Sequence, residues 1–215
     1  MSEFPPNITV RRMSLNDINT VVEIHIEQFP NSRSTSLGRI YLRKMYRWFV
    51  EKQSELSLVI LDSSQIVGFA VGAIGGYGRK IFRYTLGEIA LGILLHPGLL
   101  YKKRTFQLWQ SYLKGLLPAR SKAASQSDDI DAPAADRRAS LCSIAIARSA
   151  QGRGLGKALL FASEDCFRDM GIAQVMLSVQ SSNLPARRLY ESCQWENQGD
   201  LAELGSTSYR KRLVC

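Results

Sequence analysis

The chain contains few of the residues from which metal sites and membrane spans are built. Only two of its 215 residues are histidine, so a histidine-rich metal site is excluded and we expect no bound metal. Its four cysteines are scattered and form neither a CxxC pair nor a zinc-type spacing with histidine. The apolar run at residues 89–95 is too short to cross a bilayer.

These absences also bear on where the protein works. The first residues, MSEFPPNITVRR, lack the apolar core of a secretory signal peptide. Scattered cysteines are typical of buried free thiols rather than of a disulfide framework. We therefore expect a cytoplasmic protein, with a peripheral position at the inner membrane as the alternative.

The composition is that of a soluble globular protein, with 45% hydrophobic and 22% charged residues. Basic residues exceed acidic ones, and the formal net charge is +9. An anionic partner fits this charge, whether nucleic acid, an anionic membrane surface or a phosphate-rich cofactor. A basic, solvated surface fits it equally well. Since charge is the only feature that points to nucleic acid, we expect no nucleic-acid partner.

Hydrophobic periodicity predicts helices and strands on both sides of an unusual middle segment. Ser14, with Asp17 three residues later, forms a capping box that starts the first helix. Before the middle segment, the predicted order is strand 8–13, helix, loop 30–36, helix 37–53, and hairpin strands 56–62 and 65–74, closed by residues 75–80. After it, the order is strand 139–147, helix 155–170, strand 173–179, a short helix from residue 183, a strand from residue 195, and strand 205–213.

The middle segment, at about residues 79–138, is interpreted as an insertion in a single domain of residues 1–215. Residues 81–122 are apolar and basic, and their spacing predicts two helices broken at His96-Pro97-Gly98. Residues 124–136 are small and polar, which predicts a flexible loop. Residues 99–120 mix aromatic, leucine and basic side chains, so they suit a lid, a homodimer contact or a membrane-surface patch.

A glycine-rich loop at Gly152, Gly154 and Gly156 lies between a predicted strand and a predicted helix. Neither the P-loop nor the dinucleotide fingerprint matches, because Gly152 and Gly156 enclose only three residues and Lys157 stands where a third dinucleotide glycine is needed. Unpaired N–H groups and the dipole at a helix start still favour an anion there. Arg153 and Lys157 add positive charge. A plain glycine turn is the alternative.

Two motifs resemble those of a known family. The segment Gln151-Gly152-Arg153-Gly154-Leu155-Gly156, after a strand, resembles motif A, (Q/R)-x-x-G-x-(G/A), of the GNAT superfamily of N-acetyltransferases. Residues 183–191, NLPARRLYE, resemble its second signature, N-x-x-A-x-x-L-Y-E, and residues 209–213 resemble its last strand. The resemblance implies an α/β fold with a mixed sheet in which two central strands splay apart.

The resemblance also implies binding of acetyl-CoA as co-substrate. The backbone of Ile144 and Ile146 would pair with the pantetheine arm, and Asn183 would contact that arm. Three kinds of group are implied at the pyrophosphate. The backbone N–H groups of Gly152, Gly154 and Gly156 would surround it, the side chains of Arg153 and Lys157 would face it, and Gln151 would lie at the start of the loop. A strand N–H near Ile146 would stabilise the tetrahedral oxyanion.

Tyr190 is the residue that the resemblance implies as general acid for the leaving CoA thiolate. A core aromatic on an amphipathic helix is the alternative. No general base is assigned. His25 on an apolar helix face suits a buried core histidine, and Glu88 suits an ion pair with Arg83 or Lys80. The candidates are Glu23, His25, Glu27, Glu88 and Ser143.

We therefore expect an N-acetyltransferase that moves the acetyl group from acetyl-CoA to a primary amine by direct attack in a ternary complex. An amino sugar is one acceptor class, because the insertion resembles that of a GNAT subgroup associated with glycan biosynthesis. A peptide amine and a polyamine are the others. The alternative is a non-catalytic module that binds acyl-CoA, a membrane or a partner through the same fold.

Overall fold

The computed structural model describes residues 7–52, 55–75, 77–89, 138–201 and 205–213. Most of the predicted insertion at 79–138 lies outside these ranges. The predicted helix break at His96-Pro97-Gly98, the amphipathic stretch 99–120 and the loop 124–136 all lie outside them too. That residues 1–215 form a single domain stays a prediction.

The described residues form one mixed sheet of seven strands in the order β1-β2-β3-β4-β5-β7-β6. All neighbouring strands are antiparallel except β4 and β5, which run parallel. The sheet confirms the predicted α/β class. Its strands are β1 (Ile8–Arg12), β2 (Leu56–Asp62), β3 (Gln65–Ile74), β4 (Arg138–Ile146), β5 (Gln174–Gln180), β6 (Glu196–Leu201) and β7 (Ser206–Arg212).

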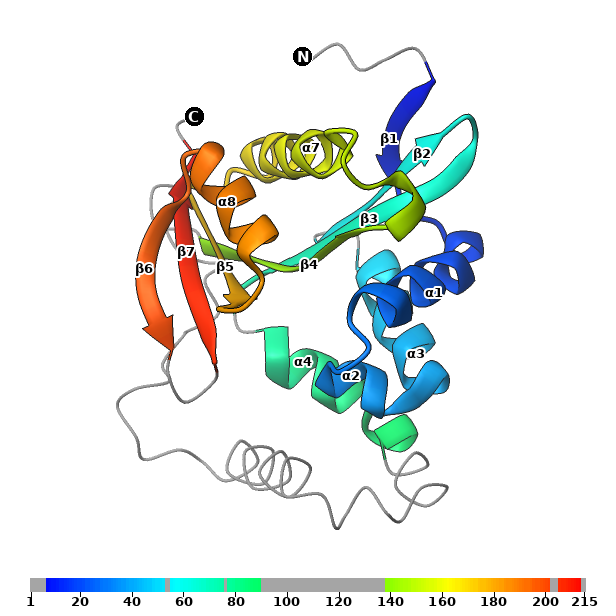
Figure 1. Ribbon diagram of the computed structural model, residues 1–215. Coiled ribbons are helices and arrows are strands. Elements are labelled where there is room, and N and C mark those ends of the chain that lie inside the picture. The colour runs from blue at the N-terminus through cyan, green and yellow to red at the C-terminus, as the bar shows by residue number, and fades with distance from the viewer. Residues whose placement is uncertain (1–6, 53–54, 76, 90–137, 202–204, 214–215) are drawn as a thin grey trace, which may run out of the picture.

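Helices cover both faces of this sheet (Figure 1). The α7 helix packs on one face against β2, β3 and β4, whereas α1 and α3 pack on the other. The described helices are η1 (Leu15–Asp17), α1 (Ile18–Gln28), α2 (Arg33–Ser36), α3 (Gly38–Glu51), α4 (Tyr77–Tyr84), η5 (Arg148–Ala150), α7 (Leu155–Asp169) and α8 (Leu184–Ser192).

Two hydrophobic cores result from this arrangement, one on each side of the sheet. In β2, Leu58 and Ile60 belong to the core under α7, and Val59 between them belongs to the core under α1 and α3. Successive strand residues face opposite sides, so a strand buried on both faces must be apolar at nearly every position. This requirement explains the continuous apolar run that predicted the hairpin.

Two local predictions were wrong. Residues 30–36 are not loop throughout, because α2 begins after Ser32, whose hydroxyl accepts a hydrogen bond from the backbone N–H of Thr35. Residues 75–80 do not simply close the hairpin, because α4 begins at Tyr77. In both places a helix of one or two turns is too short to show a hydrophobic period in the sequence.

The two parallel strands pair over only part of their length. β4 and β5 are in register from Arg138 to Ser140 on one strand and from Gln174 to Met176 on the other. Beyond Ser140, β4 continues to Ile146 on its β3 side alone, with a bulge at Cys142. The predicted splay of the central strands is therefore confirmed, and the diverging ends frame the candidate site.

Candidate functional site

The glycine loop takes a backbone conformation that suits anion binding. Gly152 and Gly154 both have φ of 76°, a left-handed conformation that other residues adopt at a cost. Gly154 is the N-cap of α7, and no side chain caps that helix. The first N–H groups of α7 therefore have no intrahelical acceptor and face the loop at the positive end of the helix dipole.

The two basic side chains of this loop have partners that the sequence did not predict. Arg153 forms an ion pair with Asp62 at the end of β2, with 2.6 Å between Nη1 and Oδ2. The Lys157 ammonium lies 5.6 Å from the centre of the Phe161 ring. Their predicted role at a phosphate group is untested. Arg153 would bind an anion while it is also held by Asp62.

Gln151 connects the loop to β4 and α1. Its side-chain amide donates to the carbonyl of Ile146 at 3.0 Å and to Oε1 of Gln28 at 2.8 Å. The carbonyl of Ile146, at the end of β4, thus accepts a hydrogen bond from Gln151. Gln151 therefore acts in this structure as a brace between the strand end and the last turn of α1.

On the other side of the splay, Asn183 starts α8. Its Oδ1 accepts the backbone N–H of Ala186 at 3.2 Å, which is the ordinary role of an N-cap asparagine. Pro185 occupies the first turn of α8, where a missing backbone N–H costs nothing. This cap orients the helix that carries Tyr190.

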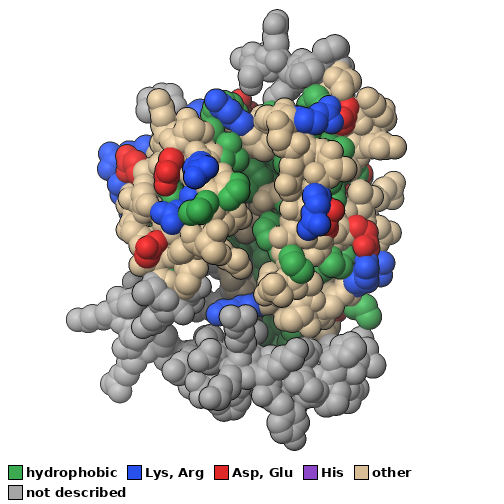
Figure 2. Space-filling model, viewed as in Figure 1, with side chains coloured by type: hydrophobic (Ala, Val, Ile, Leu, Met, Phe, Trp, Pro, Cys, Tyr) green, Lys and Arg blue, Asp and Glu red, His purple; other side chains and the backbone are tan. Residues whose placement is uncertain are grey.

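Two cavities meet at the splayed strands. One of about 400 Å³ is lined by the glycine loop and the end of β4. The other, of about 560 Å³, lies between β4, β5 and the α1–α2 connection. Figure 2 shows the hollow between the two halves of the molecule, with hydrophobic side chains at its floor. Both cavities are lined by Gln28, Phe29, Ile144, Asn183, Ala186 and Tyr190.

Tyr190 is the core aromatic that the sequence offered as one of its two roles, and its role as general acid stays a prediction. It is 5% exposed, and its ring packs 5.9 Å from Trp195 and 5.6 Å from Tyr209, measured between ring centroids. Burial raises the pKa of its phenol to about 12, so the side chain keeps its proton at neutral pH. Tyr190 is a core aromatic that also lines both cavities, which is the position a proton donor needs.

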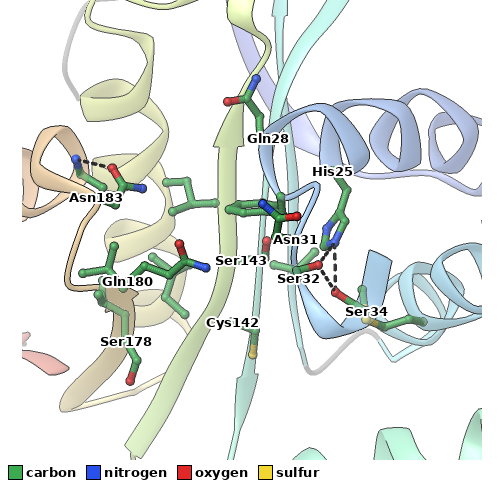
Figure 3. Close-up of a pocket in the computed structure, with 18 of the residues that line it drawn as sticks. His25, Gln28, Asn31, Ser32, Ser34, Cys142, Ser143, Ser178, Gln180 and Asn183 are labelled. Carbon is green, nitrogen blue, oxygen red and sulfur yellow. Dashed lines mark hydrogen bonds between the residues drawn. The ribbon is translucent and has the colours of Figure 1, made fainter. Parts of the chain in front are cut away.

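The described lining of the larger cavity mixes apolar side chains with uncharged polar ones (Figure 3). Hydroxyl and amide groups alternate with apolar side chains, and none of the described lining residues is Asp, Glu, Lys or Arg. The sequence patterns did not identify this set, because it is assembled from α1, α2, β4, β5 and the loops between them. The members with serine hydroxyl, amide or imidazole groups are His25, Gln28, Asn31, Ser32, Ser34, Ser143, Ser178, Gln180 and Asn183, and Tyr77, Cys142 and Tyr190 also line the cavity.

His25 lies in the wall of this cavity, at the C-terminal end of α1. Its Nδ1 is 2.6 Å from the Tyr46 hydroxyl, and its Nε2 is 3.0 Å from the Ser34 hydroxyl. Burial lowers the pKa of the imidazole to about 4, so the ring is neutral at physiological pH. The sequence suggested a buried core histidine. The structure confirms the burial and adds contact with the cavity.

The remaining general-base candidates lie elsewhere. Glu27 accepts the backbone N–H of Arg148 at 3.0 Å, and Glu23 pairs with Arg39. Glu88, which follows α4, forms an ion pair with Lys44 of α3 at 3.4 Å, a partner that the sequence did not indicate. Of the five candidates, only His25 and Ser143 line the larger cavity.

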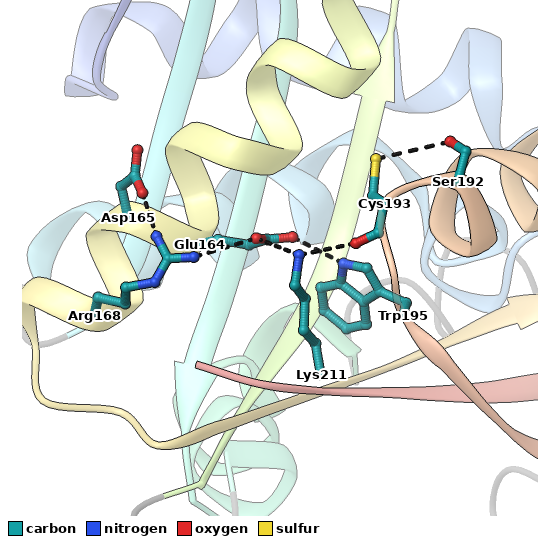
Figure 4. A network of polar contacts seen from close by, with 7 residues as sticks. All are labelled: Glu164, Asp165, Arg168, Ser192, Cys193, Trp195 and Lys211. Carbon is teal, nitrogen blue, oxygen red and sulfur yellow. Dashed lines mark hydrogen bonds and ion pairs between the residues drawn. The ribbon is translucent and has the colours of Figure 1, made fainter. Parts of the chain in front are cut away.

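Behind the site, a buried ion cluster ties three elements together (Figure 4). Glu164 of α7 accepts hydrogen bonds from the Lys211 ammonium at 2.7 Å and from the Trp195 indole at 2.9 Å. Lys211 also donates to the carbonyl of Cys193 at 2.9 Å. The helix that starts at the glycine loop is thereby joined to the turn that follows Tyr190.

Fold and site together define an α/β arrangement with a glycine loop at an uncapped helix start and a cleft between splayed strands. Comparison with known proteins identifies this class. The model of a family described as "Acetyltransferase (GNAT) family" matches residues 119–195. That range contains both motifs that resemble the GNAT superfamily, at residues 151–156 and 183–191. The predicted subgroup with a basic insertion stays a prediction.

Solved structures share the fold. The protein yncA from Salmonella typhimurium, solved with its cofactor acetyl-CoA, is 16% identical, with a TM-score of 0.58 over 97% of this chain and 95% of that one. The paiA N-acetyltransferase from Thermoplasma acidophilum, in complex with coenzyme A, is 14% identical, with a TM-score of 0.56 over 95% and 98%. At these identities the likeness concerns the fold alone.

A curated relative matches only a short stretch. The mycothiol acetyltransferase of Thermomonospora curvata is 54% identical over 44 residues, which are 20% of this chain and 15% of that protein. In the described part of the chain, no helix is both long and apolar enough to cross a membrane. Within the same ranges, no cluster of three His, Cys, Asp or Glu side chains is placed to hold a metal ion.

Proposed function

We propose that the protein transfers the acetyl group of acetyl-CoA to a primary amine. The observation that carries this proposal is the pair of joined cavities. One opens at an uncapped helix start with two left-handed glycines, and the other opens beyond the splayed strands, with Tyr190 lining both. A pyrophosphate fits the first cavity because N–H groups, and no carboxylate among the described lining residues, surround it.

The proposal retains each cofactor contact that the family resemblance implied. The pantetheine arm would run along β4 at Ile144 and Ile146, where that strand has no β5 partner. The loop from Gln151 to Gly156 and Lys157 would hold the pyrophosphate, with Asn183 on the opposite wall. A backbone N–H of β4 near Ile146 would stabilise the oxyanion of the tetrahedral adduct.

Chemistry at the strand ends then needs two proton movements. The amine attacks the thioester carbonyl, a C–N bond forms, and the C–S bond breaks. The nitrogen loses one proton to solvent, the leaving sulfur gains one from the Tyr190 phenol, and the phenolate regains its proton from solvent. The raised pKa of Tyr190 keeps that proton in place until the thiolate forms.

The uncharged lining of the larger cavity supports a small, hydroxyl-rich acceptor such as an amino sugar. Hydroxyl and amide side chains can donate to and accept from the hydroxyl groups of a sugar. A polyamine would enter as a polycation, and the described lining offers it no carboxylate. A peptide amine stays the second acceptor class.

Thiol release in the presence of acetyl-CoA and an amine panel tests this function. The panel contains amino sugars, a peptide with a free N-terminus, and a polyamine. We expect release with an amino sugar and a fall in kcat of about a hundredfold or more in Tyr190→Phe. Tyr84→Phe is the matched control, because that phenol bonds Glu51 and is absent from both cavity linings.

Binding of acetyl-CoA without release for any amine would contradict catalysis and favour a non-catalytic acyl-CoA-binding module. Peripheral membrane contact through residues 99–120 and a homodimer stay predictions about residues outside the described ranges. A peripheral position at the inner membrane also stays a prediction. A vesicle sedimentation assay and the solution mass test them.

A further inference from the structure

A row of short hydrogen bonds joins α1 to the start of α2 in one wall of the larger cavity (Figure 3). The Nε2 atom of His25 lies 3.0 Å from the Ser34 hydroxyl, which lies 3.0 Å from the Ser32 hydroxyl. Ser32 in turn lies 2.8 Å from the Thr35 hydroxyl. His25, Ser32 and Ser34 line the cavity, whereas Thr35 is absent from its described lining.

One carbonyl sets the direction of every bond in this row. The Thr35 hydroxyl donates to the carbonyl of Phe29 at 2.7 Å, and a carbonyl can only accept. Because a hydroxyl has a single proton, the Thr35 proton is committed, and Ser32 must donate to Thr35. By the same count Ser34 donates to Ser32, and the Nε2–H of His25 donates to Ser34.

The neutral state of His25 fits this direction. Burial lowers the pKa of the imidazole to about 4, so the ring carries one proton at neutral pH. With that proton on Nε2, Nδ1 is an acceptor, and the Tyr46 phenol 2.6 Å away donates to it. In the opposite tautomer Ser34 would donate to His25, and the single Ser32 proton could not fill both of the Ser32 contacts with Ser34 and Thr35.

The acceptor capacity of these hydroxyls is nearly filled as well. A hydroxyl oxygen has two lone pairs, and Ser32 uses both, because it accepts the Ser34 proton and the backbone N–H of Thr35 at 3.1 Å. Among the described residues, Ser34 accepts only the Nε2–H of His25, so one of its lone pairs is left. Ser34 is partly exposed and lines the cavity. Its hydroxyl can therefore accept a hydrogen bond from a ligand, while its own proton is committed to Ser32.

We propose that Ser34 is a specificity-determining residue that accepts a hydrogen bond from a hydroxyl group of the acceptor amine. This inference rests on the proposed acetyl transfer, with the acceptor in the larger cavity. A hydroxyl fits better than a second ammonium group, because none of the described lining residues carries a carboxylate. A carboxylate or phosphate group at this place would meet a lone pair instead of a proton. The wall therefore favours hydroxylated amines over amino acids and phosphorylated amines.

The tautomer of His25 tests the direction of the row without any substrate. In protein that carries the NMR-active nitrogen isotope in its histidines, a protonated ring nitrogen is distinguished from an unprotonated one by its chemical shift. We expect Nε2 of His25 to be protonated and Nδ1 to be unprotonated at neutral pH. The chain has one other histidine, His96, and the spectrum of His25→Gln identifies which signals belong to His25. A protonated Nδ1 in the wild type, or an equal mixture of the two tautomers, would overturn the proposal.

Analogues of an amino sugar test the contact with Ser34. The probe is glucosamine, or the amino sugar of the panel that reacts fastest, with one hydroxyl at a time replaced by hydrogen or by fluorine. Fluorine can accept a hydrogen bond weakly but cannot donate one. We expect one position at which both replacements lower the wild-type kcat/KM by about three- to tenfold, the usual value of one neutral hydrogen bond.

Ser34→Ala assigns that loss to a residue. In this variant the unmodified sugar should lose the same factor, and both replacements at the sensitive position should cost nothing further, as in a double-mutant cycle. Ser36→Ala is the matched control and should keep the wild-type rates. The exposed Ser36 hydroxyl bonds the carbonyl of Arg33, and Ser36 is absent from the described lining.

The outcomes separate this inference from the proposed function. If Ser34→Ala keeps the wild-type rate and the wild-type response to every analogue, the contact is overturned and acetyl transfer stands. The same holds if fluorine restores the rate that hydrogen loses, because Ser34 would then donate, or if amines other than amino sugars are the only substrates. If the wild type binds acetyl-CoA and acetylates no amine, both proposals fail.

Circular dichroism shows whether Ser34→Ala folds. Should it unfold, the His25 tautomer and the analogue series in the wild type decide together. Equal rates for all analogues would then overturn the inference, and an Nε2-protonated His25 with one position sensitive to both replacements would support it.

Discussion

The indole N–H of Trp195 donates a 2.9 Å hydrogen bond to Glu164, a carboxylate that is only 2% exposed. The backbone N–H of Trp195 bonds the carbonyl of Tyr190 at 3.0 Å, so this contact also orders the end of α8. Lys211 of β7 forms an ion pair with Glu164 and so balances the negative charge of this carboxylate. A carboxylate is stable in a buried position only with such hydrogen-bond and charge partners. Through Trp195, Glu164 therefore fixes the position of Tyr190 relative to α7.

Glu164→Gln should destabilise the fold by about 2–4 kcal/mol, because it leaves the mostly buried Lys211 ammonium without a counter-charge. Urea unfolding measures this loss. The neighbouring Asp165→Asn is the control, since Asp165 is exposed and pairs only with Arg168 among the described residues. Its effect should stay within about 0.5 kcal/mol. Equal losses in the two variants would contradict the role of the cluster.

Gly72→Ala should also be destabilising, here through overpacking. A Cβ at this position would lie 2.6 Å from the Phe167 ring and 2.8 Å from the carbonyl of Ser140. Since that carbonyl belongs to the paired strand β4, it cannot move aside cheaply, and we expect a loss of about 1–3 kcal/mol.

Gly78→Ala provides the comparison, because a Cβ there would meet nothing within 4 Å and Gly78 lies in α4. It should leave stability unchanged or raise it by up to about 1 kcal/mol. Chemical denaturation of both variants measures the difference. A Gly72→Ala protein as stable as the wild type would show that β3 and α7 are packed less closely than described.

His25 should make stability depend on pH. Its folded pKa of about 4 lies below the ordinary value of 6.5, so the unfolded chain binds the proton more readily between these values. The contribution of His25 is therefore fully present above about pH 6.5 and is lost as pH falls toward 4. We expect about 2–3 kcal/mol over this window.

The test is the unfolding free energy of wild type and His25→Gln at a series of pH values. The variant curve should be flatter between pH 4 and 6.5, because glutamine does not titrate. Carboxylates such as Asp17, whose pKa the Arg11 guanidinium lowers to about 2, titrate below this window and cancel in the comparison. Parallel curves would show that the imidazole is not desolvated as the structure indicates.

Asp62 should weaken anion binding at the glycine loop. It holds Arg153 at 2.6 Å and places a negative charge beside the loop. Asp62→Asn should therefore tighten acetyl-CoA binding, by about two- to fivefold at low salt, and the gain should shrink at high salt. Arg153→Gln should weaken binding. Calorimetry at two salt concentrations measures both, and unchanged affinity in both variants would exclude Arg153 from the phosphate site.

Local signals were enough to predict much of the fold. The hairpin around Ser63 and Ser64, both with positive φ, followed from two apolar runs and a two-residue turn. The helix predicted at residues 155–170 is observed as α7, and Gly171, with φ of 71°, follows its C-cap. These features depend on residues close together in the chain, and a single sequence records them directly.

The parts that were missed depend on residues far apart in the sequence. Arg153 meets Asp62, and Glu88 meets Lys44, only because the sheet and α4 bring them together. The Tyr46–His25 pair joins α3 to α1 in the same way. A buried histidine and an arginine-rich helix can be recognised in the sequence, but packing determines which residues they contact. The glycine loop and Asn183 were found because each belongs to a contiguous motif.

Calorimetric titration of acetyl-CoA into wild type, Gly154→Asn and Gly154→Asp tests the central claim most directly. Asparagine and aspartate both tolerate the left-handed backbone of Gly154, so the two variants have nearly the same shape and differ by one negative charge. If the loop holds a pyrophosphate, the wild type binds and the aspartate variant binds about tenfold or more weaker than the asparagine variant. Equal binding by the two variants, or no binding by the folded wild type, would contradict the account.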